Sequence, residues 1–133
     1  MTDRLKNKVA LITGAGTRGE IMGIGQASSI LMAREGAKIL INDINADRAK
    51  STLRQIENEG GKGLVIAEDC TKEEGCKSIV KRCLDQFGKI DILFNNVGSV
   101  GRGMVTEVEE ENWQKAIDSN LKSAVIMSKY VVP

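Results

Sequence analysis

Hydrophobic and polar positions divide this chain into two kinds of segment that alternate. Short runs rich in Val, Ile and Leu predict buried strands at Val9–Thr13, Lys38–Asn42, Gly63–Ala67 and Ile90–Asn95. Between them lie longer stretches in which apolar residues recur at helical spacing. Such an alternation of strand and helix is typical of an α/β fold, in which helices cover both faces of a parallel sheet.

Apolar stripes predict which face each helix buries. The first stripe consists of Ile24, Ala27 and Leu31. The stripe of the third helix contains Cys76 and Cys83, which we expect to pack in the core. The stripe of the fourth helix is formed by Trp113, Ile117, Leu121, Ala124 and Val125.

Helix ends carry their own signals. Glycines at Gly36, Gly60 and Gly88 are predicted to end the first three helices. Asn45 is the predicted cap of the second helix. The sequence Thr71–Glu74 has the pattern of a capping box, which predicts the start of the third helix there.

Four strands and four helices predict a Rossmann-type doubly wound parallel sheet. Right-handed crossovers give it the partial strand order 3-2-1-4. A complete dinucleotide-binding fold has about six strands, so we expect residues 1–133 to form a single, incomplete domain truncated to about four strands.

Composition narrows the function classes. The 19 basic and 18 acidic residues are well mixed, without the basic face expected of a nucleic-acid binder. No apolar run approaches the roughly 20 residues of a membrane-spanning helix, and the N-terminus lacks a secretory signal. Three cysteines without a disulfide pattern favour a reducing, cytoplasmic location. Because histidine is absent, we expect no metal site, and acid–base chemistry must use other groups.

A glycine-rich turn follows the first predicted strand, over Thr13–Gly25. Glycines let the backbone turn tightly and approach a pyrophosphate, which the N-terminus of the next helix attracts. Gly14, Gly16 and Gly19 match G-x-G-x-x-G, but a helix starting there would contain two interior glycines at about 1 kcal/mol each. We therefore expect the helix to begin at Gly23–Gly25, where the apolar period starts.

This turn resembles the cofactor loop of short-chain dehydrogenases/reductases, whose pattern is Thr-Gly-x-x-x-Gly-x-Gly. The resemblance implies that Gly14, Gly16, Gly23, Ile24 and Gly25 lie at the cofactor. Counted from Thr13-Gly14, the loop is five residues longer than the pattern. Arg18 lies in the extra segment, where it could reach a phosphate or remain solvated.

Asp43 follows the second strand, 18 residues after Gly25. A carboxylate at this distance can accept both ribose hydroxyls of NAD and would repel the 2′-phosphate of NADP. The alternative is a simple helix cap. Arg18 is the one residue that argues for NADP, and we expect NAD.

Later segments extend the resemblance. Asp69 and Cys70 match the places where the family binds adenine, although Asp69 could also cap the next helix. Asn95-Asn96-Val97-Gly98 is similar to the family's Asn-Asn-Ala-Gly, which implies cofactor contacts for Asn95, Asn96 and Gly98.

Asn120 matches an asparagine to which the family assigns a proton-relay role, and it is our one catalytic candidate. A mid-helix asparagine can also be solvated or bend its helix. The family's serine and Tyr-x-x-x-Lys are not matched: the sole tyrosine, Tyr130, has no lysine four residues later.

The resemblance implies an NAD(P)-dependent oxidoreductase that transfers hydride between the cofactor and a small alcohol or ketone, as a homo-oligomer when complete. We expect this chain to carry the cofactor-binding half and to be inactive alone. Two alternatives stay open. One is a non-catalytic nucleotide-binding module, and the other is an S-adenosylmethionine-dependent methyltransferase, which also uses a glycine loop and a ribose-binding acid.

Overall fold

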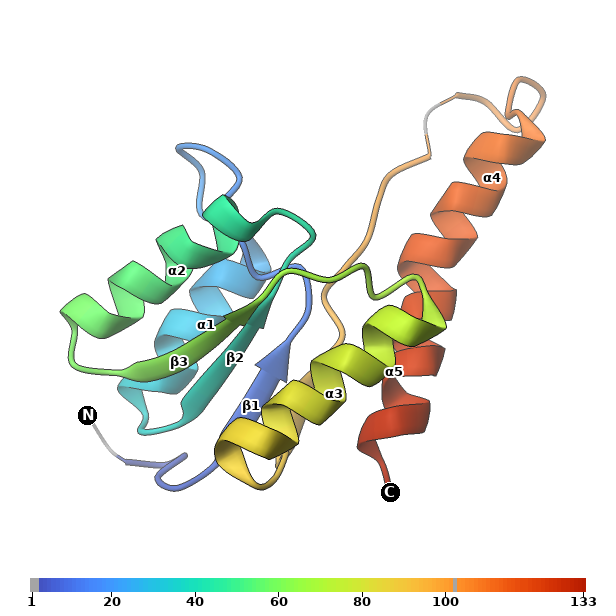
Figure 1. Ribbon diagram of the computed structural model, residues 1–133. Helices are drawn as coiled ribbons and strands as arrows, with labels where there is room; N and C mark the ends of the chain where they lie inside the picture. Colours follow the sequence, from blue (N-terminus) through green and yellow to red (C-terminus); the bar gives the residue numbers. More distant parts are fainter. Residues whose placement is uncertain (1–2, 102) are drawn as a thin grey trace.

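A computed structural model describes residues 3–101 and 103–133, and its core is a parallel sheet (Figure 1). The strand order is β3-β2-β1-β4. The strands are β1 (Val9–Ile12), β2 (Lys38–Asn42), β3 (Lys62–Ile66) and β4 (Ile92–Phe94). The predicted α/β class and the order 3-2-1-4 are confirmed, and β2 has the bounds expected from its apolar run.

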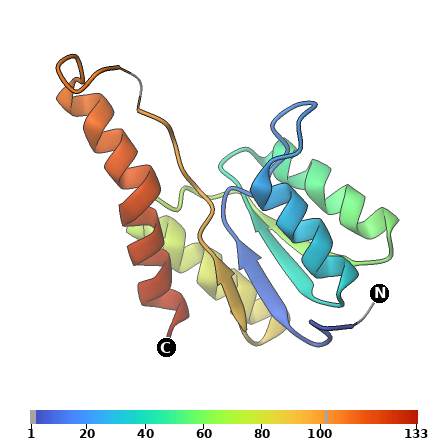
Figure 2. The same ribbon diagram turned by 180° about the vertical axis from the view of Figure 1, so that it is seen from behind.

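Helices cover both faces of the sheet. Helices α1 (Ile24–Arg34) and α2 (Ala46–Asn58) lie on one face, and α3 (Glu73–Phe87) lies on the other (Figure 1). The fourth predicted helix is one rod of three parts: α4 (Glu110–Ile117), the π-helical turn η1 (Asp118–Lys122) and α5 (Ser123–Val131). Figure 2 shows this rod beside α3, with α4 projecting past the end of the sheet.

Successive residues of β1 belong alternately to two hydrophobic clusters, one on each face of the sheet. Val9 and Leu11 of β1 pack toward α3 and α5, together with Met127. Ala10 and Ile12 pack toward α1 and α2. Because β1 is covered on both faces, all of its residues are buried, as expected of a central parallel strand.

Several predicted helix ends are confirmed. The Asn45 side chain accepts a hydrogen bond from the Arg48 amide at 3.0 Å, which caps α2. Gly36, Gly60 and Gly88 have φ values of +92°, +81° and +76°, the left-handed conformation that ends a helix most easily with glycine. These ends fix the directions in which the chain enters β2, β3 and β4.

The predicted capping box is wrong. Helix α3 begins at Glu73, and its cap residue, Lys72, makes no side-chain cap hydrogen bond. The Thr71 hydroxyl instead donates to Asp69 at 2.7 Å, and the Thr71 amide donates to the same carboxylate at 2.9 Å. A local turn at Asp69 therefore competes successfully for the Thr71 side chain.

The predicted buried stripe of the first helix is also wrong in two of three positions. Ile24 is 72% exposed and Leu31 is 56% exposed. The buried residues of α1 are Gly25, Gln26, Ser29, Ile30 and Ala33, and three of them, Gly25, Ser29 and Ala33, are small and four residues apart. Small side chains let the helix lie close to the strands, and a search for large apolar residues overlooks them.

The predicted buried stripe of the fourth helix is wrong because, within the described ranges, most of the rod has no element packed against it. Helix α4 has no buried residue, and Trp113, Leu121 and Val125 are each more than half exposed. The α5 end of the rod packs on α3, through a face that buries Ser123 and Met127. Among the described residues, no helix combines the length and the hydrophobicity needed to cross a membrane.

Candidate functional site

The carboxyl ends of the strands meet at one edge of the sheet, where the glycine-rich turn leaves β1 (Figure 1). The first part of the turn is held against β2 and α2. The Ala15 amide donates to the Asn42 carbonyl at 3.0 Å, and the Thr17 amide donates to the Arg48 carbonyl at 3.1 Å. The Thr52 hydroxyl donates to the Ala15 carbonyl at 2.8 Å. Residues 15–17 therefore have a fixed path.

The turn is equally tied to the end of β4. The Asn96 side-chain amide donates to the Gly14 carbonyl at 3.0 Å. The Thr13 hydroxyl accepts from the backbone amides of Asn96 and Val97, at 3.0 and 3.2 Å. A Cβ on Gly25 would lie 2.5 Å from the Asn96 amide nitrogen and 2.7 Å from the Gly14 carbonyl oxygen, so this crossing requires glycine. Helix α1 begins after its cap residue, Gly23, which confirms the second of the two predicted registers.

Three cavities that share lining residues follow this edge of the sheet, and together we call them the edge groove. The residues of the first are Gly14, Arg18, Asn42, Asp43, Ile44, Glu68, Asp69, Cys70, Thr71 and Val97. The second is lined by Gly14, Gly16, Arg18, Gly23, Ile24, Gly25, Asn96 and Gly98. The third is lined by Arg18, Gly98, Ser99, Val100 and Asn120. All of the predicted site residues except Asn95 line the groove.

Asp43 stands at the start of the groove with its carboxylate already oriented. It is only 5% exposed. One oxygen accepts the Gly16 amide at 3.0 Å, and the other accepts the Asn45 amide at 3.0 Å. Two amides fix its direction and leave the remaining lone pairs free for hydroxyl donors.

Asp69 and Cys70 follow β3 at the same end of the groove. The Asp69 carboxylate holds the Thr71 turn described above. The Cys70 carbonyl accepts a hydrogen bond from the Cys76 thiol at 3.1 Å. Burial raises the pKa of the Cys70 thiol to about 12 and that of the Cys76 thiol to about 11, so both are neutral. Cys83 is likewise buried, which confirms the predicted core positions of Cys76 and Cys83.

Asn95 and Asn120 take different directions. The Asn95 side chain points to α5, where its amide lies 3.4 Å from the Ser128 hydroxyl, and it lines none of the three cavities. Asn120 lies in the π-helical turn, and its amide donates to the Ser99 and Ala116 carbonyls, both at 2.8 Å. Its oxygen faces Gly98, where a Cβ would come within 2.6 Å. Asn120 thus joins the rod to the segment after β4.

Thr13 is the structural residue that sequence reasoning passed over. It stands in the quoted loop pattern, but only the fold reveals that its hydroxyl receives two amides from the end of β4. Tyr130 lines none of the three cavities, because its hydroxyl donates to Glu73 on α3. Among the described residues, no cluster of His, Cys, Asp and Glu has a metal-binding arrangement.

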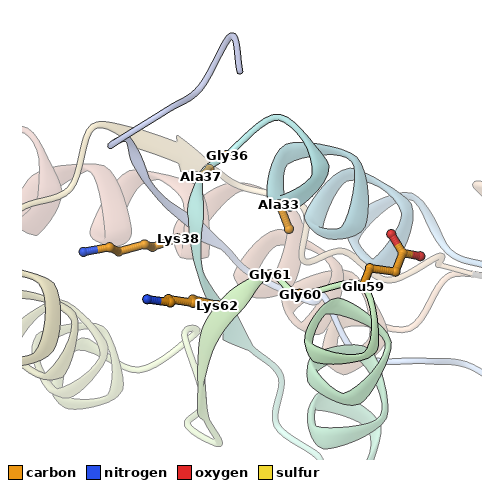
Figure 3. Close-up of a pocket in the computed structure, with 8 residues that line it drawn as sticks. All are labelled: Ala33, Gly36, Ala37, Lys38, Glu59, Gly60, Gly61 and Lys62. Atoms are coloured by element: carbon orange, nitrogen blue, oxygen red, sulfur yellow. The ribbon is translucent and has the colours of Figure 1, made fainter. Parts of the chain in front are cut away.

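Figure 3 shows a separate cavity at the opposite, amino ends of the strands. Lys38 and Lys62 are register partners on β2 and β3, and their side chains extend side by side, away from Glu59. This cavity contains none of the predicted site residues. The site residues predicted from the sequence lie at the carboxyl edge instead.

A family model described as short chain dehydrogenase matches residues 8–133. The chain belongs to this family. An uncharacterized oxidoreductase of Thermotoga maritima is 39% identical over 96% of the chain and 48% of its own length. Cyclohexanol dehydrogenase of an Acinetobacter species is 34% identical over 100% of the chain and 51% of its own length.

Solved structures of the family share the fold. A 7α-hydroxysteroid dehydrogenase, solved with NADH and 7-oxo glycochenodeoxycholic acid, superposes with a TM-score of 0.89. It is 32% identical, over 99% of this chain and 49% of that one. The chain spans about half the length of the curated relatives it matches. Short-chain dehydrogenases bind nicotinamide cofactors, and the match to this family gives the methyltransferase alternative no support.

Proposed function

We propose that this chain is the cofactor-binding half of an NAD-dependent oxidoreductase that transfers hydride between the nicotinamide and a small alcohol or ketone. One observation carries the proposal. The edge groove runs from an oriented carboxylate, Asp43, past the N-terminus of α1 to Asn120 in the π-helical turn. π-Helical turns inside helices are frequent at functional sites.

The lining residues fit the parts of a dinucleotide. The glycine-rich backbone and the free amides that begin α1 suit a diphosphate, which the helix dipole attracts. The Asp43 carboxylate suits the two hydroxyls of a ribose. Asp69 and the Cys70 backbone lie where an adenine would follow. We assign Gly14, Gly16, Gly23, Ile24 and Gly25 to the cofactor loop.

The other end of the groove is assigned to the reacting ring and the substrate. Asn96 and Gly98 line the passage toward it, and Asn120 is its polar side chain. When bound, a nicotinamide supplies the hydride acceptor or donor. We propose that Asn120 holds the proton-relay path by fixing the Ser99 backbone and that Asn95 supports the strand end from the α5 side.

Proton transfer to or from the substrate needs a further group. The family's Tyr-x-x-x-Lys has no counterpart within the 133 residues. We therefore propose that residues 1–133 form one incomplete NAD-binding domain, that this chain alone is inactive, and that a cytoplasmic homo-oligomer containing the whole fold performs the reaction.

The test is cofactor binding, measured by titrating the chain with NADH and NADPH and following the cofactor fluorescence. We expect NADH to bind more tightly. Asp43→Asn keeps the size of the side chain and removes its charge, so the repulsion of the 2′-phosphate should fall and the NADH/NADPH preference should shrink about tenfold. Asp47→Asn on α2 is the charge-matched control, since Asp47 lines no part of the groove. An unchanged preference in Asp43→Asn would contradict the role given to Asp43.

A further inference from the structure

Arg18 occupies a special place in the groove. It lies in the segment by which the glycine-rich turn exceeds the family pattern, and of the residues that the structure describes it alone lines all three cavities. Its position is therefore central, between the Asp43 end and the Asn120 end.

The backbone that leads to Arg18 is anchored. The Gly16 amide donates to Asp43 and the Thr17 amide donates to the Arg48 carbonyl, at 3.0 and 3.1 Å. A Cβ on Gly16 would lie 2.6 Å from the Asp43 carboxylate and 2.7 Å from the Arg48 Cβ, so the turn passes in close contact with α2. The Arg18 side chain thus leaves a fixed point of the chain, at the rim of the groove.

The charges that line the groove indicate a role for the Arg18 guanidinium. Among the described residues, the other charged side chains that line it are those of Asp43, Glu68 and Asp69, all carboxylates. Three negative charges oppose the entry of an anion, and the dipole of α1 contributes only about half a positive charge. Arg18 is exposed, and within residues 3–101 and 103–133 it forms no ion pair with a carboxylate. Its charge is available to a ligand.

We propose that Arg18 binds the diphosphate of the cofactor, as a clamp that the longer turn adds to the site. The inference rests on the proposed function. A guanidinium can form two parallel hydrogen bonds to phosphate oxygens, which suits a central position over the second cavity. The diphosphate is the anionic part of NAD, whereas a 2′-phosphate would have to lie beside the Asp43 carboxylate.

The experiment measures the affinities of NADH, NADPH, ADP and adenosine for the wild-type chain and for Arg18→Gln by titration calorimetry. Loss of a charged hydrogen-bond partner should weaken NADH and ADP by about 10-fold to 100-fold. Adenosine, which has no phosphate, should bind both proteins equally. Arg54→Gln removes the same charge from an exposed position on α2 outside the groove, and it should bind NADH like the wild type.

Each result that differs from these expectations rejects a particular part of the proposal. Equal NADH affinity in Arg18→Gln and wild type rejects the clamp and leaves the proposed function standing. A loss for NADPH that is much larger than the loss for NADH assigns Arg18 to the 2′-phosphate and rejects the diphosphate contact. A wild-type chain that binds none of the nucleotides rejects the proposed function and the clamp together. Circular dichroism and the urea midpoint of Arg18→Gln should match the wild type, because Arg18 is exposed.

Discussion

The β1–β2 half of the molecule and the β4–α4 half are enclosed to different degrees. Every residue of β1 is buried, and β1 has a strand on each side. The three residues of β4 are only half-buried, and within residues 3–101 and 103–133 β4 pairs with β1 alone. A sheet edge presents unpaired backbone groups, so β4 has surface that the central strands β1 and β2 lack, and β3 forms the opposite edge of the sheet.

The helices follow the same division. Helices α1 and α2 pack on each other and on the strands. Helix α4 buries no residue, although its sequence is amphipathic. The edge groove spans the boundary: the anchored turn at residues 15–17 belongs to the enclosed half, and Asn120 belongs to the open rod. The comparison teaches that the glycine-rich turn is held from both sides: residues 15–17 are anchored on β2 and α2, and Thr13 and Gly14 are hydrogen-bonded to the end of β4.

The largest expected effect concerns the assembly of the chain. The outer edge of β4 and the exposed side chains of Trp113, Leu121 and Val125 should make the isolated 133 residues marginally stable and self-associating. Sedimentation velocity at rising protein concentration should show a rising sedimentation coefficient. A monomer at every concentration, with cooperative unfolding, would show that the β4 edge and these exposed side chains do not cause self-association.

A pair of leucines tests the enclosed half against the open half. Leu11 is fully buried in β1, whereas Leu121 is 58% exposed on the rod. Leu11→Ala should lower the free energy of unfolding by about 2–5 kcal/mol, since it leaves a cavity in the core. Leu121→Ala should change it by about 0.5 kcal/mol or less. Urea unfolding measures the change for each variant. Similar losses of unfolding free energy would mean that the two halves do not differ in how tightly they are packed.

Sequence reasoning succeeded where the signal is local and repeated. The apolar run at residues 38–42 and the glycines that end α1, α2 and α3 led to the correct elements, because burial and left-handed φ each demand particular residue types. The residues that line the groove were largely named for the same reason: they follow strand ends, and parallel strands bring their carboxyl ends to one edge.

The predictions that failed depend on which neighbours a residue meets in the folded chain, and the local sequence pattern does not contain this information. Leu31 and Trp113 have the spacing of core residues, yet whether a helix face is covered depends on what lies opposite. Asn95 follows a strand like Asn96, but a strand turns successive side chains to opposite faces, and Asn95 meets α5. The Asp69 turn displaced the capping box since both compete for the Thr71 hydroxyl.

Two glycines offer a smaller test, at the place where the glycine-rich turn crosses the end of β4. A Cβ on Gly25 would press against the Asn96 amide and the Gly14 carbonyl, whereas a Cβ on Gly101 would meet open space. Gly25→Ala should lower the free energy of unfolding by about 1–3 kcal/mol through overpacking. Gly101→Ala should leave it unchanged or slightly higher. Equal urea midpoints for the two variants would mean that the crossing of the turn and β4 is loose.

The smallest expected effect lies at the joint between α3 and α5. The Tyr130 hydroxyl and the Lys129 ammonium, which lies 2.9 Å away, both donate to Glu73 and hold the pKa of this carboxyl at about 2, below its ordinary 4.5. A carboxyl with a lowered pKa in the folded state stabilises the fold above its unfolded pKa, and this contribution disappears as the pH falls through the folded value. The joint should therefore weaken between about pH 4.5 and pH 2.

Urea midpoints recorded across that range for the wild type and Glu73→Gln measure the contribution. The wild type should be the more stable protein near neutral pH, and the difference should shrink toward zero at the acidic end. Glu74→Gln is the matched control, since in the part of the chain that the structure describes Glu74 pairs with Lys77 on its own helix and with no residue of α5. Parallel pH profiles for wild type and Glu73→Gln would mean that the rod is held by Met127 and its apolar neighbours alone, and that the polar joint only accompanies this packing.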